Sequence, residues 1–170
     1  IDHGFAKDRI LLLTFTNKAA KEMMSRADQL LQGRGGHKQF WGGTFHSTAN
    51  RLLRMYSKLL GLKPNFTILD TDDSQSLIKT AMKDLVGSKP TVKKPSAALV
   101  HDVISFSRNS GQPIEKAIEL KYPELVKEID FIEKVASEYE NKKRAAGSLD
   151  FDDLLIFWLK LLQNPQWRPV

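Results

Sequence analysis

An uninterrupted apolar run near the start of the chain, Arg9–Phe15 (RILLLTF), restricts the fold more than any other feature. Strands that are buried on both faces of a parallel sheet have this composition, whereas half-buried strands alternate apolar and polar residues. A helix is expected immediately afterwards, because Thr16 or Asn17 can cap it and apolar residues recur at helical spacing until Gly33. A strand that passes directly into a helix is typical of an α/β domain.

The same order of strand and helix repeats in the next segment. Phe40–Phe45 is predicted as a short strand, and the following helix places Ala49, Leu53 and other apolar residues on one face until Gly61. Between the two units, Gln32–Gln39 contains three glycines and is predicted as a loop. Two strand-helix units in succession favour a parallel sheet.

The rest of the chain is predicted to be mainly helical, after a third short strand at Phe66–Leu69. Asp70 or Thr71 can cap the first of these helices, and Asp150 can cap the last. The first expected helix follows Asp70, and the last runs from Asp150 to Leu162. Between them, helices are expected at Ser96–Ser107, at Ile114–Lys121 and from Pro123 to about Ala146. The fold class predicted for this chain is therefore mostly α-helical, with two or three short parallel strands.

The positive charge of the chain is concentrated in its first third. The net charge is +6, and residues 1–64 carry 11 Lys or Arg against 4 Asp or Glu, whereas residues 65–170 carry 15 against 16. This distribution favours a polyanionic partner for the first third. Two later basic runs, Lys142-Lys143-Arg144 and the set Lys89, Lys93 and Lys94, are interpreted as solvated surface, with contact to a DNA backbone as the alternative.

Several classes of site have no support in the sequence. There are no cysteines, which excludes disulfides and thiolate metal sites and fits a reducing cytoplasm, and the four histidines show no metal-ligand spacing. No apolar run approaches the length of a membrane span, so no membrane contact is expected. Gly33–Lys38 does not match GxxxxGK[ST], and Asp152-Asp153 is explained by the preference for acids in the first turn of a helix.

The candidate functional residues lie where the first two strands end and their helices begin. Residues 14–18 read TFTNK and residues 44–47 read TFHS. Ligands of open parallel sheets lie beyond the carboxyl ends of the strands, and a helix N-terminus presents unpaired N–H groups to anions. Hydroxyl, amide, lysine and aromatic side chains there would form a track for single-stranded nucleic acid. The alternative is that Thr16, Asn17 and Ser47 only cap helices and that Phe15 and Phe45 are core residues.

Four segments resemble, in order, conserved segments of the UvrD/Rep/PcrA-type superfamily 1 ATP-dependent DNA helicases. Ile10–Met23 (ILLLTFTNKAAKEM) resembles motif Ia, and Gly43–Ser47 (GTFHS) resembles motif Ib. Asn65–Asp73 (NFTILDTDD) resembles the join into the helical 1B insertion, and Ser148–Leu155 (SLDFDDLL) resembles motif Id in the return to lobe 1A. The resemblance spans nearly the whole chain.

The resemblance implies an α/β fold of the RecA-like P-loop type. Residues 1–72 would belong to lobe 1A, residues 73–146 to the helical 1B subdomain, and residues 147–170 to the return into lobe 1A. It also implies a cytoplasmic, nucleoid-associated protein with single-stranded DNA and the junction of single- and double-stranded DNA as partners. The residues that would line the path of the single strand are Phe15, Thr16, Asn17, Lys18, Thr44, Phe45, His46 and Ser47.

The family's two ATP-phosphate motifs, the phosphate loop and the DExx strand, are absent from the 170 residues. We therefore expect a fragment of a helicase, in which the parent protein would use ATP and Mg²⁺ while this piece binds no cofactor and does not hydrolyse ATP. Two readings of other classes remain: a stand-alone nucleic-acid-binding helical module, and a helical adaptor. Helicases of this type act in DNA repair, replication and recombination, and no motif here separates these roles.

Overall fold

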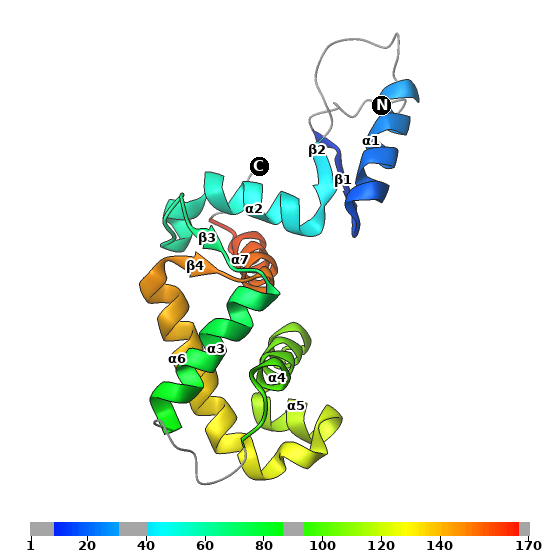
Figure 1. Cartoon of the computed structure of the whole chain (residues 1–170). Coiled ribbons are helices and arrows are strands. Elements are labelled where there is room, and N and C mark those ends of the chain that lie inside the picture. The colour runs from blue at the N-terminus through cyan, green and yellow to red at the C-terminus, as the bar shows by residue number, and fades with distance from the viewer. Residues whose placement is uncertain (1–8, 31–40, 87–93, 167–170) are drawn as a thin grey trace.

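The computed structural model describes residues 9–30, 41–86 and 94–166 of the chain. In chain order its elements are β1 (Leu11–Thr14), α1 (Asn17–Leu30), β2 (Trp41–Thr44), α2 (Phe45–Met55), η2 (Ser57–Leu60), β3 (Thr67–Ile68), α3 (Thr71–Val86), α4 (Ala97–Ser110), α5 (Ile114–Lys121), η3 (Pro123–Glu128), α6 (Ile129–Ala146), β4 (Ser148–Leu149) and α7 (Phe151–Gln163), where η denotes a 3₁₀-helix (Figure 1). The predicted loop at Gln32–Gln39 and the lysines Lys89 and Lys93 lie outside the described residues.

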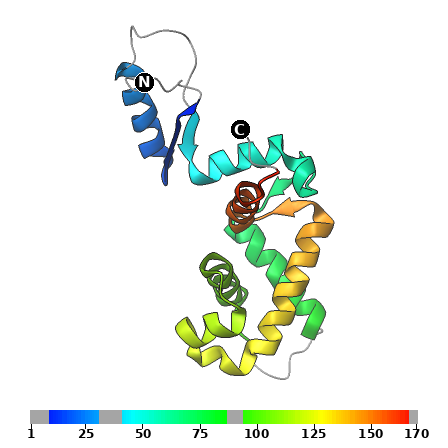
Figure 2. The same cartoon turned by 180° about the vertical axis from the view of Figure 1, so that it is seen from behind.

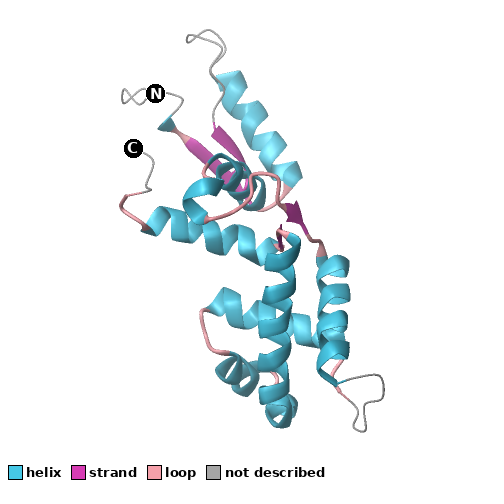
Figure 3. Cartoon of the chain, turned by 90° about the vertical axis from the view of Figure 1, so that its left-hand side faces the viewer, coloured by secondary structure: helices cyan, strands magenta, loops and turns pink. Residues whose placement is uncertain are grey.

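The predicted fold class, mostly helical with short parallel strands, is confirmed. The described strands form two parallel pairs, β1 with β2 and β3 with β4, and they occupy little of the chain beside the helices (Figure 3). The sequence did not predict β4, because its two residues are too few to show a periodic pattern. The β3–β4 pair brings Thr67 beside Ser148, so the last part of the chain returns to the segment just before α3.

Strand β1 is not buried on both faces, which corrects the expectation from its apolar sequence. Leu11 is 45% exposed, and the other three residues of the strand are half-buried. In the described part of the chain β1 pairs with β2 alone, so one strand edge and much of one face remain uncovered. Strands of this composition are usually covered on both faces in parallel sheets.

Strand β2 contains two glycines because its neighbours leave no room for side chains. A Cβ atom at Gly42 would lie 2.6 Å from the sulfur of Met24 and 2.8 Å from the carbonyl oxygen of Leu12. Gly43 has a φ of +153°, and a Cβ there would lie 2.7 Å from Oγ of Ser47. The close approach of β2 to β1, α1 and the start of α2 therefore depends on glycine.

Two hydrophobic cores lie in different parts of the molecule. Figures 1 and 2 show β1, β2 and α1 at one end, α3–α6 at the other end, and α2 and α7 between them. The α2–α7 core consists of the buried residues Ala49, Leu53, Phe66, Leu149, Leu154 and Trp158. The helical core consists of Ile78, Ala81, Val100, Val103, Ile104, Ile118, Leu125, Ile132, Val135 and Tyr139.

Most predicted helices are present, with two local differences. The helix expected to reach Gly61 ends at Met55, and a 3₁₀-helix follows before Gly61 closes it in the left-handed conformation. The long helix predicted from Pro123 begins as a 3₁₀-helix and becomes α-helical at Ile129. Among the described helices, none combines the length and apolar content that a membrane crossing needs.

Candidate nucleic-acid interface

The two strand ends identified in the sequence lie side by side. Strands β1 and β2 pair in parallel, with Thr14 opposite Thr44, so residues 15–18 and 44–47 leave the same edge of the pair. Helix α1 begins at Asn17 and helix α2 at Phe45, which places two helix N-termini at this edge. Each N-terminus presents unpaired N–H groups and partial positive charge.

Threonine hydroxyls cap both helices, so part of the capping interpretation is correct. Oγ1 of Thr16 accepts a hydrogen bond from the backbone N–H of Ala19 at 3.2 Å. Oγ1 of Thr44 accepts one from the N–H of Ser47 at 3.1 Å, and the Ser47 hydroxyl donates to the Thr44 carbonyl at 2.9 Å. Thr44 is buried, whereas Thr16 and Ser47 face solvent. These bonds hold the two turns in a defined shape.

The aromatic side chains at the strand ends form a short row. The rings of Phe15 and Phe45 lie 5.2 Å apart between centroids and are tilted by 34°, and the ring of Trp158 lies 6.3 Å from that of Phe45. Phe15 is 85% exposed and Phe45 is half-buried. Within the described chain, Phe15 is therefore not a core residue. Its ring presents an apolar face to solvent, which is the geometry that a stacking base requires.

Another exposed aromatic residue, Phe151, contacts the predicted site residue His46, and the sequence does not identify Phe151 as a site residue. Its ring packs edge-to-face on His46, with centroids 5.6 Å apart, and it is 43% exposed. Phe151 is the first residue of α7 and is separated from His46 by more than a hundred positions, so spacing gives no hint of the contact. The signal available was its place in the motif-Id-like segment, directly after the capping residue Asp150.

The remaining predicted site residues are exposed polar groups beside this row. Asn17 and Lys18 occupy the first turn of α1 and face solvent, and His46 is exposed in the first turn of α2. A lysine, an amide and two helix N-termini can contact phosphate oxygens, while the rings can stack on bases. The arrangement can therefore bind a single strand without reading its sequence.

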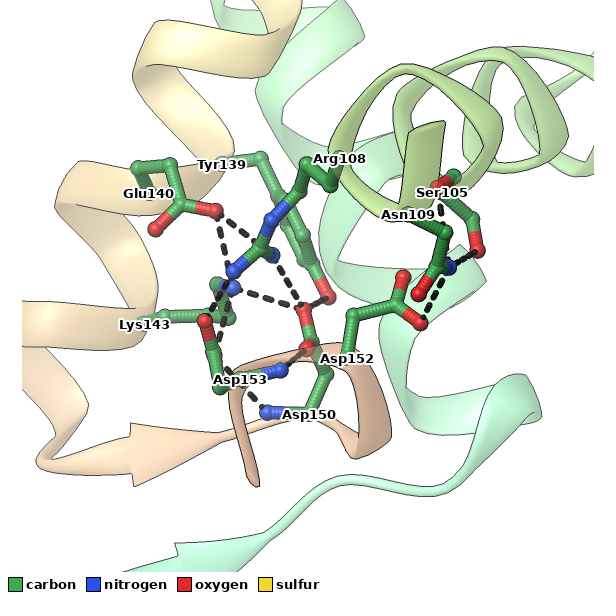
Figure 4. Close-up of polar contacts among 9 residues, drawn as sticks. All are labelled: Ser105, Arg108, Asn109, Tyr139, Glu140, Lys143, Asp150, Asp152 and Asp153. Atoms are coloured by element: carbon green, nitrogen blue, oxygen red, sulfur yellow. Dashed lines mark hydrogen bonds and ion pairs between the residues drawn. The ribbon is translucent and has the colours of Figure 1, made fainter. Parts of the chain in front are cut away.

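A second polar cluster lies where α4, α6 and the start of α7 meet (Figure 4). Nζ of Lys143 lies 2.6 Å from a carboxylate oxygen of Asp150, 2.7 Å from one of Asp153 and 2.8 Å from one of Glu140. Lys143 is only 2% exposed, so its interpretation as solvated surface is wrong. The physical reason is that its helix turns this residue, and not the adjacent Lys142, towards the carboxylates.

Arg108 of α4 and Tyr139 of α6 complete the cluster. The Arg108 guanidinium contacts Glu140 at 3.0 Å and Asp150 at 3.1 Å, and it also donates to Asp153. The Tyr139 hydroxyl donates to Asp150 at 2.9 Å. Asp150 and Asp153 also form a capping box at the start of α7, as each carboxylate accepts the other's backbone N–H.

Burial and charge act against each other on these groups. Burial raises the pKa of the Asp150 carboxyl, but the adjacent Lys143 and Arg108 outweigh it and lower that pKa to about 2. Burial lowers the pKa of Lys143 and of Arg108, yet the carboxylates around them leave both pKa values raised. Burial, followed by the charge of Asp150, raises the pKa of Tyr139. The carboxylate and both cations therefore stay charged at neutral pH.

The three carboxylates are chemically suited to a metal ion, since one oxygen each from Glu140, Asp150 and Asp153 lies within 4.8 Å of the others. Lys143 already contacts all three, so an ammonium group supplies the positive charge that a cation would bring. Asp152 instead accepts a hydrogen bond from the side chain of Asn109 at 2.8 Å. The cluster is an ion-pair network between helices.

Lys94, the described member of the set Lys89, Lys93 and Lys94, is also engaged within the chain. Its ammonium group lies 2.8 Å from a carboxylate oxygen of Glu128 and 4.5 Å from the ring centroid of Phe131. Lys142, next to the buried lysine, pairs with Asp84 at 2.6 Å. These contacts give both lysines roles within the helical part.

A family model and several curated relatives match nearly the whole chain. The family model for the UvrD/REP helicase N-terminal domain matches residues 1–168. The chain is 36% identical to ATP-dependent DNA helicase UvrD1 of Mycobacterium leprae over 156 residues, which cover 91% of the chain and 20% of that relative. It is 35% identical to ATP-dependent DNA helicase PcrA of Bacillus subtilis over 158 residues, and 37% identical to the PcrA of Staphylococcus epidermidis over 162 residues. In both cases the match covers 91% of the chain and 20% of the relative, so the chain spans about a fifth of the length of these curated relatives. The chain belongs to the UvrD/REP helicase family, in the part that the model of the N-terminal domain describes.

Proposed function

We propose that this chain forms the single-stranded DNA track, and part of the helical insertion, of an ATP-dependent DNA helicase that unwinds duplex DNA. The proposal rests on the two adjoining strand ends. There the exposed ring of Phe15 contacts the ring of Phe45, beside two helix N-termini. The residues of the track are Phe15, Thr16, Asn17, Lys18, Thr44, Phe45, His46 and Ser47, with Phe151 added from its contact with His46.

The division of the chain proposed from the sequence is supported by the distribution of the two cores. Every residue of the α2–α7 core lies within residues 1–72 or 147–170, the two segments proposed for lobe 1A. Every residue of the helical core lies within residues 73–146, the segment proposed for subdomain 1B. On this proposal the unpaired edge of β1 would pair with a further strand of a RecA-like sheet, and helices would cover its exposed face.

Hydrolysis of ATP by such a helicase needs groups that place nucleotide and Mg²⁺ together, and this chain contains no GxxxxGK[ST] sequence. The role proposed for the chain is therefore to hold the strand on which the motor acts. The junction of single- and double-stranded DNA is proposed as a second partner, because the family resemblance implies it. A protein with this task would act on the bacterial nucleoid in the cytoplasm, in repair, replication or recombination.

Equilibrium binding of a fluorescent oligothymidine tests the proposal, with the dissociation constant measured across a series of salt concentrations. Phe15→Ala should weaken binding by about 1–3 kcal/mol without altering the salt dependence, because stacking on a base releases no counterions. Lys18→Ala should weaken binding and reduce the slope of log K against log salt by about 0.7, the counterion release per single-strand phosphate.

Two controls are matched to these substitutions within the helical part. Leu120→Ala shortens an apolar side chain that is 63% exposed, and Lys79→Ala removes an exposed charge from α3. Neither should change binding beyond the effect of net charge. Equal losses from Phe15→Ala and Leu120→Ala would contradict the proposal, as would a chain that binds no oligothymidine at low salt.

A further inference from the structure

The two hydrophobic cores meet at a polar joint. The buried residues of the helical core end at Tyr139, and those of the α2–α7 core include Leu149 and Leu154, on either side of the ion-pair network around Lys143. Apolar surfaces attract one another without fixing a direction, whereas charged hydrogen bonds require particular distances and angles. The network, which joins Arg108 and Lys143 of the helical part to Asp150 and Asp153 at the start of α7, therefore helps to set the relative placement of the two parts.

Helix α4 reaches α7 through two neighbouring residues of its last turns. Arg108 donates to Asp150 and Asp153, and the side chain of Asn109 donates to Asp152 at 2.8 Å. Figure 4 shows these two side chains side by side on α4, facing the first turn of α7. Together they contact all three aspartates of that turn.

Phe151 lies between these aspartates in the sequence. Its neighbours Asp150 and Asp152 accept from Arg108 and Asn109, and its own ring lies 5.6 Å from the ring of His46 at the start of α2. The backbone that carries Phe151 is thus held on both sides by α4, while its side chain contacts the candidate DNA track. A chain of direct contacts runs from the helical part to that track.

We propose that Arg108 is a positioning residue for nucleic-acid binding: through Asp150 and Asp153 it fixes Phe151, and through Phe151 it fixes His46. The inference rests on the proposed DNA track and adds that the ion-pair network couples the track to the helical part. A movement of α4 relative to α7 would shift Phe151 against His46, which directly follows Phe45 in the chain. A planar guanidinium suits this task because it holds two carboxylates in a fixed geometry, which a lysine ammonium does not.

The first test needs no DNA and reads the position of the rings directly. The Hε1 resonance of His46, identified by its loss in His46→Gln, depends on the ring current of Phe151. Arg108→Lys should shift this resonance, and Asn109→Ala should shift it in the same direction by less. Lys94→Met removes another partly buried ion pair of the helical part, that with Glu128, and should leave the resonance in place. An unchanged resonance in folded Arg108→Lys overturns the inference.

The second test asks whether Arg108 acts through Phe151 in binding oligothymidine. Arg108→Lys should weaken binding by about 2- to 30-fold, the range of couplings carried by packed side chains. In a Phe151→Ala background the same substitution should have no further effect, because the transmitting ring is gone. Additive losses would show that Arg108 acts independently of Phe151 and would overturn the inference.

The two proposals fail in different ways. If Phe15→Ala and Phe151→Ala both bind oligothymidine as tightly as the unsubstituted chain, the DNA track is wrong, whatever the His46 resonance shows. If Phe15→Ala weakens binding but Arg108→Lys does not, the track stands and the positioning role of Arg108 is wrong. Circular dichroism of each variant, with Arg108→Lys chosen because it keeps the positive charge, establishes that folded proteins are compared.

Discussion

Replacement of Lys143 by methionine should destabilise the chain strongly, although the sequence places this residue in an ordinary run of basic residues. Lys143 is 2% exposed and contacts three carboxylates, two of them almost fully buried. Methionine fills similar space but leaves Asp150 and Asp153 with Arg108 as their main cation. Removal of one partner from a buried ion pair costs about 3–5 kcal/mol. That is a large part of the roughly 5–15 kcal/mol that stabilises a typical domain.

The neighbouring Lys142 provides the matched control. It is the same residue type in the same helix, but its partner Asp84 is exposed, and such pairs contribute little to stability. Lys142→Met should therefore leave the free energy of unfolding nearly unchanged. Urea denaturation followed by circular dichroism at 222 nm measures both variants. Equal effects of the two substitutions would refute the burial argument.

The pH dependence of the same variants tests the electrostatic cause. The pKa of Asp150 is lowered from 3.8 to about 2 on folding, so its contribution is present above the unfolded value and disappears as the pH falls towards 2. The shift corresponds to about 2 kcal/mol at 1.36 kcal/mol per unit. Without Lys143 this pKa rises, so the variant loses less stability in acid. The difference in the free energy of unfolding between Lys143→Met and the unsubstituted chain should therefore narrow between roughly pH 5 and pH 2, by less than this amount because Arg108 still lowers the pKa of Asp150. A gap independent of pH would contradict the account.

Three further predictions concern other parts of the chain. Gly43→Ala should lower the melting temperature and weaken oligothymidine binding, because φ is +153° and a Cβ would lie 2.7 Å from Oγ of Ser47; normal binding by this variant would contradict the role of the turn. Amide hydrogen exchange should be faster in β1 than in α6, since β1 has one described strand partner and α6 carries the helical core. Slower exchange in β1 would mean that its uncovered face is protected in another way. The chain should release no phosphate from ATP with saturating single-stranded DNA and Mg²⁺, because it lacks a phosphate loop, and DNA-stimulated release from the pure chain would refute this.

Local patterns predicted most of the secondary structure. The apolar run before Thr16 predicts strand β1, and the apolar residues at helical spacing predict helix α6. Asp150 caps α7, as its position in the sequence predicts. The observed bounds of α5, Ile114–Lys121, are those predicted from the sequence. The β4 strand and the 3₁₀ segments were missed, because each is too short for a periodic pattern and depends on tertiary contacts.

Features that depend on tertiary neighbours were the least predictable. Lys142 and Lys143 are chemically alike and adjacent, yet only the path of α4 and α7 decides which is buried. Phe151 meets His46 across a long separation in sequence, so no local rule points to their contact. In contrast, the sequence predicts that residues 14–18 and 44–47 lie together, because the carboxyl ends of parallel strands meet at one edge of a sheet.

Chemical-shift mapping of the isotopically labelled chain during titration with oligothymidine tests the proposed DNA track most directly, because it reports every residue at once. The account predicts that the largest amide and aromatic shifts fall at residues 15–18, at residues 44–47 and at Phe151. Residues of α5 and η3, at the far end of the helical part, should change little. Shifts concentrated in those helices, with Phe15 and Phe45 unaffected at saturation, would contradict the claim that the paired strand ends hold the single strand.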